Sequence, residues 1–337
     1  FVLYLLMMIA IGAFYAKGNN NSEDYFLGGR KLNGFVAALS AQASDMSGWL
    51  LMGLPGAIYL TGVGGDGWIA IGLFIGTTLN WLFIATKLRR YTIRANNSVT
   101  LPTYFENRFH DEKKVLMAVS SITIVVFFLV YCASALSAGG QLFESVFGID
   151  YHVALTIGAL VVLVYTFLGG FTAVCVTDFI QGMLMLVGIL AVPLFAYHFL
   201  TTGGTTLSAG LEASGADSAN FLNLMKNGDG SNNIISVISG LGWGLGYFGM
   251  PHILVRFMAV RDEKEMTKSK ATAISWVALS LGFAVFIGIL GRAYLPELVN
   301  GNNEKVFIEM IKKVFTVEMR APFIAGLFLC GILAAIM

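Results

Sequence analysis

The residues with the clearest potential for chemistry form a polar run, Ser40 to Trp49, inside a long apolar segment. The run reads Ser-Ala-Gln-Ala-Ser-Asp-Met-Ser-Gly-Trp, so Asp45 stands among small and hydroxylated residues. A charge at the middle of a bilayer costs about 2.5–3.5 kcal/mol on insertion scales, and intramembrane ionisable residues are usually functional. Hydroxyl and carboxylate oxygens suit a hard cation such as sodium. The run therefore predicts a cation site within a membrane.

The role of Asp45 is not fixed by its neighbours in the sequence. Segment 35–61 contains no Lys or Arg that could pair with it locally. The carboxylate could coordinate a cation directly, hold an unwound backbone open by hydrogen bonds, or stay neutral because it is buried. The hydroxyls of Ser44 and Ser47 could likewise bind the cation or bond back to their own helix.

The elements that carry these residues are predicted to be two interrupted helices, 35–61 and 231–258. Each contains glycines and a proline that would strain a continuous helix: Gly48, Gly53 and Pro55 in the first, and Gly242, Gly244, Gly246, Gly249 and Pro251 in the second. Such paired segments are the best sequence sign of a transporter binding site. Trp243 and Tyr247 would add aromatic walls with polar tips. The alternative for the second segment is a tight Gly-rich contact between helices.

Other polar residues in apolar segments have more than one interpretation. Asp178 lies either at a cytoplasmic turn or on an ion exit path, and Tyr131 is either a core tyrosine or part of a site. Structural roles are expected for the histidines, which lack metal-ligand spacing: His110, His152, His198 and His252. No Ser/His/Asp or Cys/His set indicates hydrolysis, and no nucleotide-binding signature is present, so an enzyme is not expected.

The composition indicates a polytopic membrane protein. Of the 337 residues, 56% are hydrophobic and 12% are charged, and the mean hydropathy is +0.75. Soluble domains carry about 25% charged residues. The net charge of +1 gives no reason to expect nucleic acid as a partner. A spanning helix needs about 20 apolar residues, which predicts nine segments: 1–16, 35–61, 67–86, 115–147, 151–173, 174–200, 231–258, 271–295 and 321–337.

Basic residues predict the orientation of these segments. If the N-terminus is extracytoplasmic, three cytoplasmic loops hold most of the 21 Lys and Arg residues. Arg256 is counted here with the last of these loops. The distribution follows the positive-inside rule, and it predicts a multi-pass protein of the inner (plasma) membrane.

Three strings of the sequence closely resemble the sodium/solute symporter family, and the similarity extends over essentially the whole chain. They are Gly28-Gly-Arg30, Ser40 to Gly56, and Trp243 to Met258. The resemblance implies an all-α, LeuT-type fold with two five-helix repeats of inverted topology after one extra helix. In a single transporter domain, 1–337, the extra helix is then 1–16, the first repeat is 35–200, and 231–337 is a truncated second repeat.

The resemblance also implies roles for matched positions. The expected cation-binding residues are Ala43 and Met46, through backbone carbonyls to sodium, together with Asp45, Ser47 and Asp178. The expected proline-binding residues are Ser47, Gly48, Tyr131, Trp243, Tyr247 and Pro251. Arg30 matches a position that affects sodium-linked transport. The family completes its sodium site with Ser/Thr hydroxyls just beyond the position of Met337, so the chain is expected to be a fragment that lacks them.

These observations predict secondary active transport, in which sodium moving down its gradient drives uptake of L-proline by alternating access. Sodium is the expected coupling ion. One alternative is sodium-coupled uptake of another small solute, such as a different amino acid or a carboxylate. Another is the symporter-like membrane domain of a sensor kinase.

Overall fold

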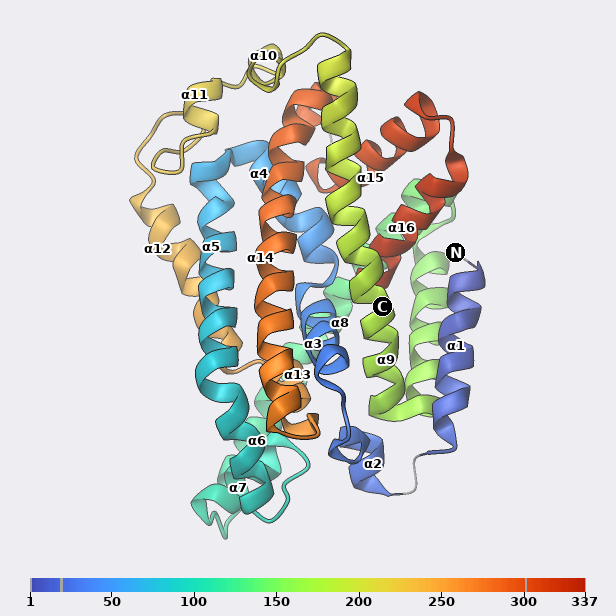
Figure 1. Ribbon diagram of the computed structural model, residues 1–337, viewed down its shortest axis with the longest axis vertical. Helices are drawn as coiled ribbons and strands as arrows, with labels where there is room; N and C mark the ends of the chain where they lie inside the picture. Colours follow the sequence, from blue (N-terminus) through green and yellow to red (C-terminus); the bar gives the residue numbers. More distant parts are fainter. Residues whose placement is uncertain (1, 19–20, 301, 337) are drawn as a thin grey trace.

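Long apolar runs fold as helices here, since a bilayer offers the backbone no hydrogen-bond partner. The computed structural model describes residues 2–18, 21–300 and 302–336, and these form helices joined by short 3₁₀ and π segments (Figure 1). In chain order the α-helices are α1 (Val2–Ala16), α2 (Ser22–Leu27), α3 (Gly34–Gly48), α4 (Leu54–Thr61), α5 (Val63–Leu79), α6 (Ala85–Arg94), α7 (Leu101–Phe109), α8 (Val115–Phe147), α9 (Tyr151–Thr202), α10 (Leu207–Ala213), α11 (Ser218–Phe221), α12 (Ile234–Trp243), α13 (Pro251–Ala259), α14 (Glu263–Tyr294), α15 (Val306–Ile311) and α16 (Pro322–Ile336).

The predicted spanning segments correspond to helices, with some differences in length. Four continuous stretches are long and apolar enough to cross a membrane: Val63–Arg94, Val115–Glu144, Tyr151–Thr202 and Glu263–Tyr294. The predicted limits 67–86 and 271–295 were too short, because both helices continue into charged turns beyond their apolar runs. Segments 1–16 and 321–337 are helical as predicted, although Phe1 and Met337 themselves lie outside the described residues.

Helix α9 has two arms, and the chain folds back on itself between them at Gly170. Its 52 residues would measure about 78 Å at 1.5 Å per residue, far more than a bilayer core of about 30 Å. Gly170 has φ 60° and ψ −162°, a conformation open to glycine. Figure 1 shows the two arms side by side, with α1 packed against the first. The turn predicted at Gly169-Gly170 is confirmed.

Both helices that were predicted to be interrupted are broken. In the first, Ser47 has φ 47° and ψ −166°, and a π segment, Trp49–Gly53, leads into α4. In the second, α12 continues through the 3₁₀ segment Gly244–Phe248 and bends by 43° before α13. The first half of one broken helix, α3, packs against the second half of the other, α13. This contact brings the two breaks together.

Glycines bring α12 close to α5. Cβ atoms at Gly72 and Gly76 would overlap the backbone of Gly240 and Gly244 respectively. A Cβ at Gly242 or Gly246, in contrast, would meet no atom within 4 Å. The alternative of a tight Gly-rich contact is therefore correct for one face of this segment, while the other face is open.

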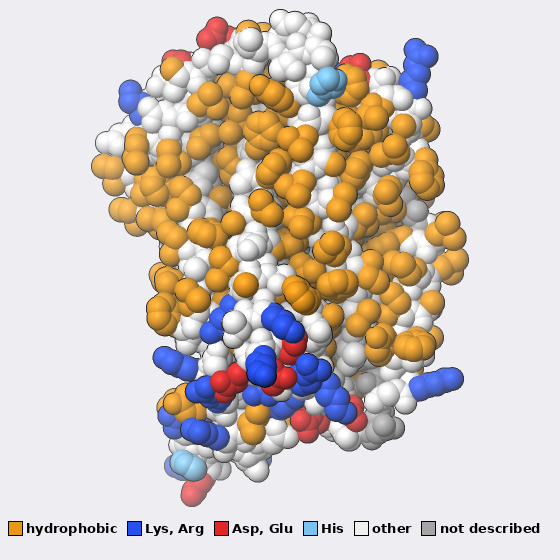
Figure 2. Space-filling model, in the orientation of Figure 1, with side chains coloured by type: hydrophobic (Ala, Val, Ile, Leu, Met, Phe, Trp, Pro, Cys, Tyr) orange, Lys and Arg blue, Asp and Glu red, His pale blue; other side chains and the backbone are white. Residues whose placement is uncertain are grey.

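Charge is concentrated at one end of the molecule. Figure 2 shows Lys and Arg side chains around the end that carries α2, α6 and α7, and apolar side chains over the length above it. At this end Leu32 and Val260 form a short parallel bridge, which ties the start of α3 to the end of α13.

Candidate functional site

The break in α3 opens onto a cavity of about 290 Å³. Ser47 adopts a backbone conformation that non-glycine residues rarely occupy, and such strain of about 1–3 kcal/mol is typical of functional sites. Polar side chains contribute to the walls, which is unusual inside an apolar protein. The lining residues are Ser47, Gly48, Trp49, Met52, Gly53, Tyr131, Ser134, Ala135, Ser137, Ala138, Gln141 and Glu304.

Asp45 lies just before this break and is almost fully buried. Its side chain is 3% exposed, and Oδ1 is 3.8 Å from Nε2 of His252. Oδ2 has no hydrogen-bond partner among the described residues. Tyr131 and Tyr247 lie close enough to this carboxylate to interact with it electrostatically. An unpartnered buried carboxylate oxygen is costly, so this group is suited to a ligand that supplies positive charge or hydrogen-bond donors.

The structure brings Tyr131 and Tyr247, two of the predicted proline-binding residues, near Asp45. The Tyr131 hydroxyl donates to the carbonyl of Ser44 at 2.8 Å, across from α8 to α3. Tyr247 is buried, and its carbonyl accepts a hydrogen bond from the side-chain amide of Asn80, the residue that follows α5. Pro251 begins α13, since its missing N–H is no loss at the first helical position. Pro251 lines a different cavity from the one at the break in α3.

Trp243 is not part of this group. It is half exposed and stacks on Trp49 with a centroid distance of 5.6 Å and an interplanar angle of 24°. Because Trp49 lines the cavity, the stack links Trp243 to the cavity wall.

The two residues expected to offer backbone carbonyls to sodium, Ala43 and Met46, are both buried in α3. The Met46 carbonyl already accepts a hydrogen bond from the Trp49 N–H. Gly48 lies beside Ile336 at the end of α16. A Cβ added at Gly48 would lie 3.2 Å from the Ile336 side chain. The sodium roles of Ala43 and Met46 remain predictions.

Asp178 belongs to a separate buried network. Its Oδ2 accepts hydrogen bonds from Ser40 at 2.6 Å, Ser44 at 3.1 Å and the Arg256 guanidinium at 2.8 Å. Arg256 also donates to both serine hydroxyls and to the carbonyl of His252. Both charged side chains are less than 10% exposed. The interpretation of Asp178 as a residue of a surface turn is therefore wrong, and so is the assignment of Arg256 to a loop, because it lies inside α13.

Arg30 lies away from both breaks, at the charged end of the molecule. It donates to the Asn97 side chain and to the carbonyls of Ser98 and Met258, at 2.8–3.0 Å. Burial lowers the pKa of its guanidinium from the ordinary value, and nearby Glu23 opposes this shift. The contacts connect the loop before α3 with the loop before α7 and with α13.

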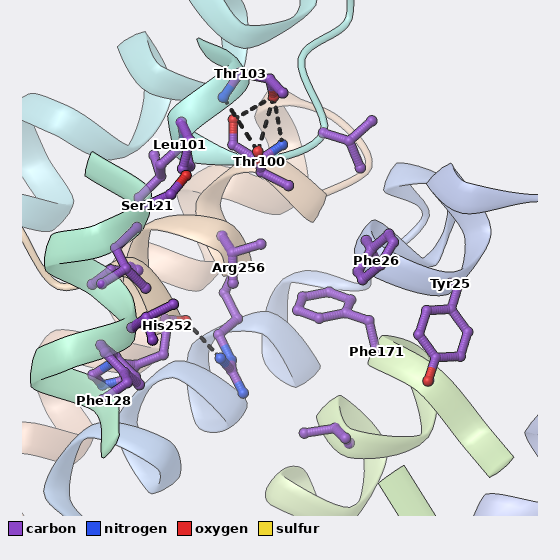
Figure 3. Close-up of a pocket in the computed structure, with 18 of the residues that line it drawn as sticks. Tyr25, Phe26, Thr100, Leu101, Thr103, Ser121, Phe128, Phe171, His252 and Arg256 are labelled. Atoms are coloured by element: carbon purple, nitrogen blue, oxygen red, sulfur yellow. Dashed lines mark hydrogen bonds between the residues drawn. The ribbon is translucent and has the colours of Figure 1, made fainter. Parts of the chain in front are cut away.

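A second, larger cavity of about 680 Å³ lies between α8 and the group α2, α9 and α13. Figure 3 shows Tyr25, Phe26 and Phe171 on one side, and Phe128 and His252 on the other. Its walls reach α2 and α7, so it extends from His252 to the charged end.

Two residues of the site were missed in the sequence. His252 was expected to be structural, but it is the closest basic group to Asp45. Arg256 was counted as a loop residue, although its position five residues after Pro251 placed it within an apolar segment. An intramembrane charge is itself a sign of function, and it was the available signal for Arg256.

The comparisons with known proteins agree with this geometry. The family model described as "Sodium:solute symporter family" matches residues 25–337. The chain is 45% identical over 343 residues to the "Sodium/proline symporter" of Salmonella typhimurium and 43% identical over 338 residues to that of Staphylococcus aureus. These alignments cover 100% and 99% of the chain, but 66% and 63% of the relatives, so the chain spans just under two thirds of their length.

A solved structure of a sodium-coupled sialic acid symporter has the same fold. It matches with a TM-score of 0.79 at 21% identity, over 99% of this chain and 69% of that chain. The match to the family model covers far more than half of the sequence. The chain therefore belongs to the sodium:solute symporter family.

Proposed function

We propose that the full-length protein, of which this chain is a part, takes up L-proline together with sodium. The observation that carries the proposal is the meeting of two broken helices near Asp45, with Tyr131 and Tyr247 beside it. The names of relatives that are 43–45% identical support proline as the solute and sodium as the coupling ion.

We assign the ligand roles by position. Sodium binds at the break in α3, with Ala43 and Met46 contributing carbonyls and Asp45 and Ser47 contributing side-chain oxygens. Proline occupies the cavity at the break in α3, which Ser47, Gly48 and Tyr131 line. The other residues assigned to proline, Trp243, Tyr247 and Pro251, belong to the second broken helix and lie outside this lining. Asp178 assists cation passage through the buried network, and Arg30 acts in coupling from the charged end.

Transport proceeds by alternating access to this site. The two cavities are consistent with approach from one end of the molecule and release at the other. The repeats are 35–200 and 231–337 in inverted topology, with 1–16 as an extra helix. The charged end is cytoplasmic, as the Lys and Arg distribution in Figure 2 supports, so the N-terminus is extracytoplasmic.

The test is uptake of radiolabelled proline by the full-length protein in proteoliposomes, with an inward gradient of sodium or of choline. We expect accumulation only with sodium. Uptake that is indifferent to the sodium gradient would contradict sodium coupling, and absence of proline uptake by a folded protein would indicate another solute or a sensor.

A further inference from the structure

We propose that the His252 side chain is the gate between the two cavities, an assignment that rests on the transport function proposed above. The smaller cavity contains the break in α3, and the larger one leads from His252 to the charged end (Figure 3). Within the described part of the chain, no residue lines both cavities. A solute that crosses the protein through them must therefore pass a barrier.

Helix α8 locates this barrier. Residues between 117 and 128 of α8 line the larger cavity, and residues between 131 and 141 line the smaller one. The boundary falls between Phe128 and Tyr131, which are about 4.5 Å apart along the helix axis at 1.5 Å per residue. The two cavities thus follow one another along a single helix, separated by less than one turn.

Three mutually packed rings occupy the boundary. The centroid of His252 is 5.4 Å from that of Phe128 and 5.7 Å from that of Tyr131, on which it stacks with an interplanar angle of 21°. Phe128 and Tyr131 are themselves 5.7 Å apart. Two of the three rings belong to α8, and the imidazole belongs to α13. His252 therefore closes the boundary from the side of the second broken helix.

The His252 ring can leave this cluster without breaking a hydrogen bond. Tyr131 is held by its hydrogen bond to α3, and Phe128 projects from an uninterrupted stretch of α8. Both ring nitrogens of His252 lack a hydrogen-bond partner among the residues described. The nearest carboxylate oxygen, on Asp45, is 3.8 Å away, which is beyond hydrogen-bond distance. Rotation of the imidazole therefore breaks ring contacts and no hydrogen bond.

Cysteine accessibility tests this assignment without proline or sodium. The reporter is Ser134→Cys in the smaller cavity of the full-length protein, with the native cysteines replaced by alanine. A charged, membrane-impermeant methanethiosulfonate is applied to vesicles of each orientation, which identifies the side from which the charged end is reached. Ser121→Cys in the larger cavity serves as a second reporter that the fold is intact.

From the charged end, we expect Ser134→Cys to react several-fold faster in His252→Ala than with His252 present. His252→Phe, which keeps a ring, should react slowly, and His198→Ala, at an exposed position near the end of α9, should change nothing. Equal rates with and without the imidazole would overturn the gate. If His252→Ala does not fold, Phe128→Ala must open the same barrier, and an unchanged rate there would also overturn it. Either failure leaves sodium-dependent proline uptake untouched, which separates this assignment from the proposed function.

Discussion

Two buried carboxylates of this protein have opposite surroundings. Asp178 concentrates three hydrogen bonds on one oxygen, including one from Arg256. Oδ2 of Asp45 has no hydrogen-bond partner among the described residues, and the nitrogen of His252 is too distant for a hydrogen bond. A buried carboxylate oxygen that accepts several hydrogen bonds contributes to a fixed structure, whereas a buried oxygen without a partner is ready for a ligand. The contrast indicates that Asp178 and Arg256 hold the broken helices in place, whereas Asp45 is available to bind a ligand.

The largest expected effect is on stability at the paired carboxylate. Asp178→Asn leaves Arg256 buried without its counter-ion, which should lower the free energy of unfolding by about 3–5 kcal/mol. Melting temperature of the full-length protein in detergent measures it. The double variant Asp178→Asn/Arg256→Gln should recover part of the loss, because the stranded charge is gone. If Asp178→Asn alone is as stable as the parent protein, the structural role of Asp178 is contradicted.

The second prediction concerns the open carboxylate. Asp45→Asn should leave the melting temperature nearly unchanged, because in the part of the chain that the structure describes Asp45 makes no ion pair within hydrogen-bond distance. The apparent sodium affinity in proline uptake should nevertheless fall by about 30-fold or more, since loss of one partner of a buried charged contact costs about 2–5 kcal/mol. A clearly lowered melting temperature together with an unchanged apparent sodium affinity would show that Asp45 has the structural role instead.

The smallest effect tests the same contrast between packed and open positions in the 3₁₀ segment Gly244–Phe248. Gly244→Ala places a methyl group against the backbone of Gly72 and should cost about 1–3 kcal/mol of stability. Gly246→Ala is the matched control, because a Cβ there meets no atom within 4 Å, and its effect should stay within about 0.5 kcal/mol. Thermal unfolding of both variants compares them, and equal losses would contradict the assignment of faces.

Local features of the sequence were sufficient to predict both breaks. Polar and hydroxylated residues with glycine and proline in an apolar run identify 35–61 and 231–258, and the Gly169-Gly170 pair identifies the turn in α9. These features act through the conformation of a few neighbouring residues. The chain composition likewise predicted membrane helices, but charged extensions such as the start of α14 carry no apolar signal.

Partners across the fold could not be predicted in the same way. The pairing of Asp178 with Arg256 joins residues 78 positions apart and depends on how α9 and α13 each pack against α3. The same holds for His252, whose importance comes from Asp45 and Tyr131 on other helices. Gly240 and Gly244 are packed and Gly242 and Gly246 are open because only one face of the second broken helix meets α5. Each of these facts is tertiary, and a single sequence does not contain it.

The most direct test of sodium-coupled proline binding is an equilibrium measurement on the purified full-length protein. Proline affinity is measured with and without sodium, and sodium affinity with and without proline. The account predicts that each ligand strengthens the binding of the other by the same factor, as linkage requires. Affinities for proline and sodium that are each independent of the other ligand would contradict it.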